Sequence, residues 1–235
     1  MNHIISISGG LGSAVAADRV IERYGRDSTT LWFADTLWED ADLYRFLDDC
    51  MARWGGELVR HCDGRTPMDV WRERQLIPMS GFMPCGDVLK IDPFTAFVSR
   101  FFWKPVTVHL GLAWGETSRL DAPRRRYHAL SGVQVDFPLL WSDPVDLRAE
   151  VENWGVRVSR LYDIGFPHNN CGGRCPKGGH SGFRLLRQHF PKRFQEMVEF
   201  EQWSRAQGDT RANRAFLRDR RNGECKPLLL TELTS

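Results

Sequence analysis

The fold is decided by eleven residues near the start of the chain, His3-Ile4-Ile5-Ser6-Ile7-Ser8-Gly9-Gly10-Leu11-Gly12-Ser13. The apolar run that ends at Ile7 predicts a short buried strand, and the run from Ser13 to Tyr24 predicts a helix that ends at Gly25. Glycines between a strand and a helix let the backbone approach anionic oxygens, and the amides and dipole of a helix start favour an anion. The stretch therefore predicts a phosphate-binding loop.

The residues assigned to this loop are Ser8, Gly9, Gly10, Leu11, Gly12 and Ser13. Its serines add hydroxyl donors to the backbone amides. The loop lacks the lysine of a Walker A motif, so it is not a loop of that type. A plain glycine-rich turn is the alternative, but the placement directly between a strand and a helix favours phosphate binding.

Further along the chain, strand-like and helix-like segments alternate. The expected strands are Thr30–Ala34, Leu58–His61 and Val106–Leu112, with a helix over Glu39–Trp54 and a helical stretch with loops over Pro67–Phe102. Such alternation is typical of βαβ units. We therefore predict an α/β fold with a parallel twisted sheet flanked by helices.

The C-terminal part is expected to be helical. Three segments carry the pattern, Pro144–Trp154, Phe183–Gln207 and Arg211–Arg221, and a loop from Cys171 to His180 lies between them. The predicted division is a nucleotide-binding α/β domain over residues 1–141 and a helical region with the cysteine loop over residues 142–235. The helical part is expected to cover one end of the α/β core.

Composition narrows the class of protein. The chain has 235 residues, of which 42% are hydrophobic, enough for one full core. A formal net charge of only +2 argues against bulk nucleic-acid binding and leaves room for a local patch. No apolar run reaches membrane-spanning length, and Met1 leads directly into a strand without a secretory pattern. We therefore expect a cytoplasmic protein with no membrane contact, whose six cysteines are thiols, metal ligands or catalytic groups rather than disulfides.

The pattern Ser8-Gly9-Gly10-x-x-Ser13 resembles the PP-loop of the N-type ATP pyrophosphatases and phosphoadenosine phosphosulfate (PAPS) reductases, and Phe33-Ala34-Asp35-Thr36 extends the resemblance. The resemblance implies an adenine nucleotide α-hydrolase-like fold that binds ATP or PAPS, with Mg²⁺ expected. It also implies that Asp35 lies near the adenine or the ribose. The alternative for Asp35 is a helix N-cap or a turn residue.

The segment from Gly111 to Arg119 is similar to the part of this family that closes the nucleotide site. Gly111 and Glu116 are therefore expected to contact the nucleotide. Arg119 and Lys90 are expected to stabilise charge on the reacting phosphate. A surface salt bridge is the alternative for Arg119. The basic tract Pro123–Arg126 is interpreted as a solvated loop or as a phosphate or nucleic-acid contact.

The cysteines form a second motif. Cys171 and Cys175 stand four apart in a glycine-rich loop with Arg174 and Lys177 nearby, so both can point at one metal. The segment around Cys85 also resembles a cysteine-bearing segment of PAPS reductase-like proteins. That resemblance implies Cys85, Cys171 and Cys175 as ligands of an iron–sulfur cluster, with Cys85 also near the chemistry. The alternatives are zinc completed by His168, His180 or Cys225, or no metal. Cys50 and Cys62 are interpreted as structural.

The tail departs from the reductases of this family, which carry a nucleophilic cysteine in Glu-Cys-Gly-(Ile/Leu)-His. Here the tail reads Glu224-Cys225-Lys226-Pro227, so only the Glu-Cys pair matches. A catalytic Cys225 and an ordinary tail cysteine both stay open. Upstream, Arg211, Arg214, Arg218 and Arg221 recur at helical spacing, which suits a solvated face or a phosphate backbone.

Three functions compete. The first is reaction at the α-phosphate of an adenine nucleotide, with release of pyrophosphate and sulfur transfer to a nucleic acid or small acceptor. The second is reduction of PAPS or adenylyl sulfate. The third is a nucleotide-binding subunit without catalysis in a nucleic-acid modification or defence complex. The Trp- and Phe-rich helical part is compatible with a homodimer.

Overall fold

The computed structural model describes residues 2–78, 82–100, 105–207, 215–220 and 223–234. Among these residues, five strands form a parallel sheet in the order β3-β2-β1-β4-β5. The strands are β1 (Asn2–Ile7), β2 (Thr29–Asp35), β3 (Leu58–Cys62), β4 (Val106–His109) and β5 (Val133–Asp136). The predicted α/β fold with a parallel sheet flanked by helices is confirmed.

The central strand β1 marks the point where the strand order reverses. β1 pairs with β2 on one side and with β4 on the other. Its apolar residues Ile4, Ile5 and Ile7 are buried, as expected of a strand covered on both faces. Open α/β sheets bind ligands outside the carboxyl ends of the strands at such a switch point, which is where the predicted phosphate loop follows β1.

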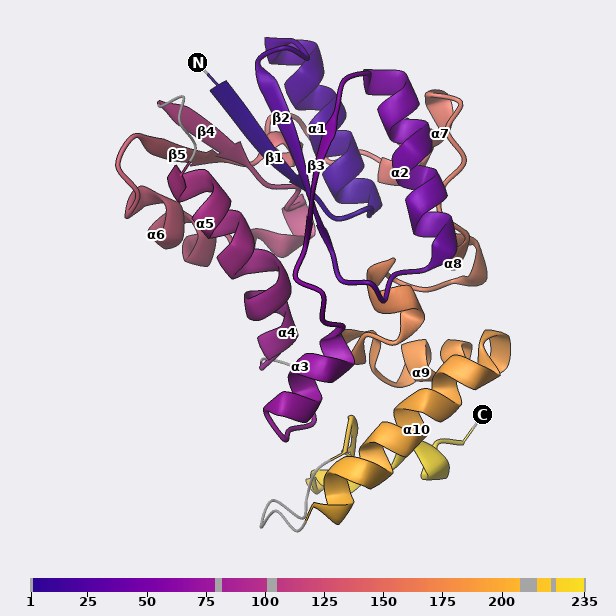
Figure 1. Cartoon of the computed structure of the whole chain (residues 1–235). Helices are drawn as coiled ribbons and strands as arrows, with labels where there is room; N and C mark the ends of the chain where they lie inside the picture. The colour runs from indigo at the N-terminus through magenta and orange to yellow at the C-terminus, as the bar shows by residue number, and fades with distance from the viewer. Residues whose placement is uncertain (1, 79–81, 101–104, 208–214, 221–222, 235) are drawn as a thin grey trace. The chain divides into compact units, whose positions relative to one another are not determined.

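Helices cover both faces of this sheet (Figure 1). Helices α1 (Leu11–Tyr24) and α2 (Ala41–Trp54) lie on one face, and α5 (Asp92–Arg100) and α6 (Asp121–His128) lie on the other. On the α5 face, Trp32 packs against Phe94 at 4.8 Å between ring centroids. The buried residues of α2, Leu43, Phe46, Leu47, Cys50 and Trp54, recur at helical spacing. The apolar pattern of the sequence thus accounts for the layers.

The contacts divide the chain into two compact units. The first consists of Met1–Asp35, Ala41–Asp63 and Lys90–Ser159, and the second of Thr36–Asp40, Gly64–Leu89 and Arg160–Ser235. The first unit contains the sheet, its four flanking helices and α7 (Leu147–Asn153). The predicted domain boundary at Trp141 stays a prediction.

The second unit is mainly helical. Its helices are α3 (Pro67–Glu73), α4 (Pro84–Gly86), α8 (Arg160–Ile164), α9 (Gly179–His189) and α10 (Pro191–Ala206). A two-stranded antiparallel pair joins β6 (Leu217–Asp219) to β7 (Lys226–Leu228). The core of this unit is rich in aromatic rings, with Trp71, Phe183 and Phe200 fully buried.

Several predicted boundaries were wrong. The helix expected over Phe183–Gln207 is two helices, because Pro191 lacks a backbone donor and starts α10 instead of continuing α9. The helix expected over Arg211–Arg221 falls partly outside the described residues, and Leu217–Asp219 within it form strand β6. The strand predicted to reach Leu112 ends at His109.

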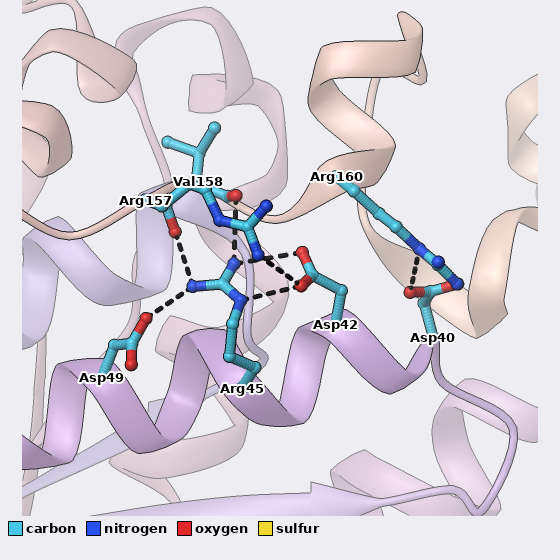
Figure 2. A network of polar contacts seen from close by, with 7 residues as sticks. All are labelled: Asp40, Asp42, Arg45, Asp49, Arg157, Val158 and Arg160. Atoms are coloured by element: carbon cyan, nitrogen blue, oxygen red, sulfur yellow. Dashed lines mark hydrogen bonds and ion pairs between the residues drawn. The ribbon is translucent and has the colours of Figure 1, made fainter.

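A charged cluster holds α2 in the first unit (Figure 2). The guanidinium of Arg45 donates to Asp42 at 2.7 Å, to Asp49 at 2.5 Å, and to the carbonyl oxygens of Arg157 and Val158. The hydrogen bond to Asp42 is the main reason that the pKa of Arg45 is raised. One arginine thus fixes the segment after α7 to the start of α2.

None of the helices in the described part of the chain combines the length and apolar character of a membrane span.

Candidate functional site

The predicted phosphate loop joins β1 to α1 with a turn at Gly9, whose φ is +75°. A Cβ at Gly9 would lie 2.6 Å from Cγ of Leu43, so both the backbone angle and the packing require glycine. Gly10, the N-cap residue, then leads into the helix in extended conformation and makes no side-chain cap hydrogen bond. The first amides of a helix have no partner within the helix, so this end can bind an anion.

Ser13 braces the loop from inside. Its hydroxyl accepts a hydrogen bond from the Ser8 amide at 3.0 Å and donates one to the Gly10 carbonyl oxygen at 2.9 Å. Ser13 is buried, whereas Ser8 is exposed and its hydroxyl lies 3.1 Å from that of Ser13. Ser8 is therefore the accessible hydroxyl, and Ser13 sets the shape of the loop.

Gly111 packs directly on the start of α1. A Cβ at Gly111 would lie 2.6 Å from the carbonyl oxygen of Gly12 and 2.8 Å from Cα of Ser13. Real Cβ atoms essentially never come that close to backbone, so two backbone segments meet here because neither carries a side chain. The segment after β4 therefore lies beside the loop. A contact between Gly111 and a nucleotide stays a prediction.

The side chain of Asp35, the last residue of β2, forms hydrogen bonds to other side chains of the protein. One carboxylate oxygen accepts from the Tyr44 hydroxyl at 2.7 Å and the other accepts from Arg60 Nε at 2.9 Å. The carboxylate is almost fully buried, and Arg60 also lies over the Tyr44 ring at 5.1 Å. Since α2 begins only at Ala41, Asp35 is not its N-cap. Arg60 and Tyr44 are partners of Asp35 that no local sequence pattern predicted, and a contact between Asp35 and a nucleotide stays a prediction.

Glu116 and Arg119 lie in a short 3₁₀ segment, η2 (Trp114–Arg119), and form an ion pair with each other. Glu116 also accepts from the Ala113 amide at 3.3 Å. Both side chains are substantially exposed, so the surface salt bridge considered above as an alternative for Arg119 is present.

Lys90 lies in a π-helical turn, η1 (Asp87–Ile91), a geometry that is frequent at functional sites. The catalytic roles of Arg119 and Lys90 stay predictions.

Three cysteines of the second unit, Cys85, Cys171 and Cys175, are buried thiols. Cys85 lies in α4 within the aromatic core, and Cys171 and Cys175 are buried in their loop. Among the residues that the structure describes, no three His, Cys, Asp or Glu side chains are placed to hold a metal ion. Either metal needs converging donors, so the iron–sulfur or zinc site predicted on Cys85, Cys171 and Cys175 stays a prediction.

The cysteine loop is held by carboxylates that follow β2, within the second unit. Glu39 accepts from the Cys171 amide at 2.5 Å. Asp40, fully buried, pairs with Arg160 at 2.8 Å (Figure 2) and with Arg193 at 2.7 Å. Arg193 also donates to the carbonyl oxygen of Gly172 at 2.9 Å. These partners are far apart in sequence, which is why no local pattern predicted them.

Arg174 completes the packing around this loop. Its guanidinium lies 4.8 Å from the Trp38 ring centroid and donates to Glu196 at 2.9 Å. Burial is the main reason that its pKa is lowered. The positive charge expected beside the cysteines is present, but it is paired with an acid and an aromatic ring.

The C-terminal cysteine differs from the others. Cys225 is exposed, and its neighbours Glu224 and Lys226 form an ion pair with each other. His180 was considered above as an alternative zinc ligand, and its Nε2 atom lies 3.0 Å from the Arg218 carbonyl oxygen. Arg211, Arg214 and Arg221 of the basic stripe lie outside the described residues.

No protein-family model matches the chain, and no curated protein matches it either. Among solved structures, the chain is similar to a phosphoadenylyl-sulfate (PAPS) reductase from Candida auris, determined as a phosphate complex. The two share 16% sequence identity, with a TM-score of 0.48 over 71% of this chain and 79% of the other. The function of the site is therefore inferred from its own residues and contacts.

Proposed function

We propose that the chain binds an adenine nucleotide with its phosphates on the loop from Ser8 to Ser13 and catalyses reaction at the α-phosphate. The construction of the loop carries the proposal. A glycine turn leads into a helix whose N-cap is Gly10, beside the exposed Ser8. Such a helix start suits phosphate oxygens. The choice of adenine rests on the resemblance of the loop and of Phe33–Thr36 to PP-loop enzymes.

The proposed reaction transfers the adenylyl group. An acceptor oxygen attacks the α-phosphorus of ATP, the bond to the bridging oxygen of pyrophosphate breaks, and pyrophosphate leaves with that electron pair. The helix amides and Arg119 or Lys90 stabilise the charge that develops on the phosphates. For sulfur transfer, we propose that a sulfur nucleophile then displaces AMP from the adenylylated acceptor, which is a nucleic acid or a small molecule. No step is assigned to a metal on the cysteines.

Gly111→Ala tests the loop, with Gly115→Ala as the matched control. A methyl group at Gly111 would push on the Gly12 carbonyl, whereas nothing lies within 4 Å of the corresponding position at Gly115. We expect nucleotide affinity to fall about tenfold or more in Gly111→Ala, which corresponds to about 1.4 kcal/mol, and to stay unchanged in Gly115→Ala. Isothermal titration calorimetry with ATP, PAPS and adenylyl sulfate measures affinity, and a pyrophosphate-release assay measures turnover.

Two results would contradict the proposal. If a folded Gly111→Ala protein bound nucleotide with wild-type affinity, the loop would not be part of the binding site. Failure of the wild-type chain to bind any of the three nucleotides would overturn nucleotide binding itself. Binding without turnover would instead favour the non-catalytic subunit, which requires a partner for activity.

A thiol-based reductase is the second candidate, and the exposure of Cys225 favours it because a nucleophilic thiol must reach its substrate. In such a reaction the Cys225 thiolate attacks the sulfur of PAPS or adenylyl sulfate, the bond from that sulfur to the phosphate oxygen breaks, and the nucleotide leaves with the electron pair. An added dithiol then reduces the resulting S-sulfocysteine, which releases sulfite and leaves the dithiol as a disulfide. Cys225→Ser should abolish this activity and leave pyrophosphate release from ATP unchanged. Cys62→Ser is the control, since Cys62 is also exposed. Loss of sulfite formation in Cys225→Ser alone would favour the reductase.

A further inference from the structure

Three titratable side chains form a line across the sheet of the first unit. Asp136 Oδ2, at the end of β5, lies 3.8 Å from Nδ1 of His109 on β4. His109 Nε2 lies 2.9 Å from Nδ1 of His3 on β1. His109 is fully buried and His3 nearly so. None of the three is among the residues assigned to the proposed nucleotide site, and His3 stands at the opposite end of β1 from the phosphate loop.

Electrostatics sets the protons along this line. A lone pair on His109 Nδ1 facing the Asp136 carboxylate would be repelled, so Nδ1 carries the proton. His109 Nε2 is then the acceptor, and His3 Nδ1 donates to it. A neutral imidazole has one donor and one acceptor nitrogen, so His3 Nε2 is left as an acceptor. Burial lowers the pKa of both histidines, to about 4 for His109, which keeps the pair neutral at physiological pH.

His3 also borders a cavity. His3 lines a cavity of about 490 Å³ together with Tyr24, Ser28, Thr107, Gln134, Val135 and Asp136. The volume falls within the range of small-molecule sites. Tyr24 stacks on the His3 ring at 3.8 Å between centroids, and so holds the imidazole in place. Among the described residues that line the cavity, none is a lysine or an arginine.

The walls of the cavity therefore favour a ligand that donates hydrogen bonds. Among the residues that the structure describes, these walls offer the Asp136 carboxylate and the His3 imidazole, and they contain no lysine or arginine. Asp136 keeps its position because one oxygen accepts from the Phe137 amide at 2.7 Å and the other from the Trp141 indole at 3.0 Å. The guanidinium of Arg23 lies over the Tyr24 and Trp141 rings but does not line the cavity.

We propose that this cavity is a second binding site, specific for a small organic cation with N–H donors such as a primary ammonium group. The ammonium would donate to Asp136 and to His3 Nε2, with the hydroxyl and amide groups of Ser28 and Gln134 at the rim. An anionic nucleotide is excluded by the same carboxylate. The proposal is independent of the nucleotide site.

The experiment follows the imidazole Cε1–H signals of His3 and His109 by NMR while methylammonium is added at pH 7. Acetamide and acetate are the neutral and anionic probes of similar size. We expect a saturable shift of the His3 signal with methylammonium only. A shift that does not saturate, or that is equal with acetamide or acetate, would overturn the proposal.

Substitutions at Gln134 sharpen the test, since this exposed residue can change without disturbing the core. Gln134→Glu adds a second carboxylate to the rim and should tighten methylammonium binding severalfold, and Gln134→Lys should abolish it. Asp136→Asn should weaken binding at least tenfold, with Asp121→Asn as an exposed control on α6. Equal affinity in Gln134→Glu and Gln134→Lys would contradict a cation site, even if Asp136→Asn failed to fold.

Discussion

Lowering the pH from 7 to 5 should destabilise the protein through His109. The residue is fully buried, and desolvation of its charged form lowers its pKa from 6.5 to about 4. Between these two values the unfolded chain binds a proton that the folded chain does not. Stability from this residue is therefore present above pH 6.5 and is lost as the pH falls toward 4.

The size of the effect follows from the shift. Each pKa unit corresponds to about 1.4 kcal/mol, so the full loss is about 3 kcal/mol. Weighting by protonation at the two pH values gives a loss of about 2 kcal/mol between pH 7 and pH 5. That is a large fraction of the stability of an ordinary domain.

Urea unfolding followed by tryptophan fluorescence at pH 7, 6 and 5 measures this loss. The comparison is with His109→Gln, which cannot titrate at this position but keeps the carboxylates that titrate elsewhere. We expect the variant to lose about 2 kcal/mol less than the wild type over this range. An NMR titration of His109 in the wild type gives an independent value. A pKa near 6.5, or equal pH dependence of the two proteins, would refute the reasoning.

Three further predictions concern the second unit and the thiols. Burial raises the pKa of Glu201, so the free energy of unfolding of the wild type should fall as the pH rises above 4.5, and Glu201→Gln should remove this pH dependence. The same substitution should lower the free energy of unfolding in urea by about 1–3 kcal/mol, because one of the two backbone N–H groups that bond to Glu201 loses its acceptor. Asp40→Asn should cost about 3 kcal/mol in thermal unfolding, because two arginines lose their buried partner; unchanged melting would contradict this. Iodoacetamide should label Cys62 and Cys225 in the native protein and leave the four buried cysteines unlabelled, as mass spectrometry can verify.

The sheet and the loop were predictable because their signals are local. Strand-like segments near β1, β2 and β3 were recognised from the sequence, and the glycine loop connects β1 to α1 as predicted. Strand β5 was missed because it has four residues, pairs only with β4 and buries only part of its surface. A short edge strand carries little of the apolar signal on which a prediction depends.

The partners of the site residues were not predictable, because they meet only in the folded chain. Asp35 was identified from its motif, but Arg60 stands 25 residues away and has no pattern of its own. His3 and His109 are 106 residues apart, and each resembles an ordinary strand residue in sequence. Their contact follows from the parallel pairing of β1 with β4, which places His3 opposite Thr107 and Ile5 opposite His109.

The cysteine loop shows how one pattern supports two physical explanations. Glycines between two cysteines let both thiols turn toward a metal, but they also let backbone pack tightly against side chains. The contacts of the described residues account for the glycines by the second explanation. A Cβ at Gly172 would lie 3.0 Å from a guanidinium nitrogen of Arg174 and 3.2 Å from one of Arg193. Cys171 itself adopts a left-handed backbone conformation, and its amide bonds to Glu39.

These contacts account for the glycines of the loop, whereas the metal site on Cys85, Cys171 and Cys175 stays a prediction. The conformation of the loop is set by what binds its backbone, and here arginines and carboxylates bind it. A metal site requires instead that the thiols themselves determine the geometry, with donors converging on one point. Cysteine spacing alone cannot distinguish the two cases, because both need glycine and nearby positive charge. The distinguishing residues, Asp40 and Arg193, lie 153 residues apart in the sequence.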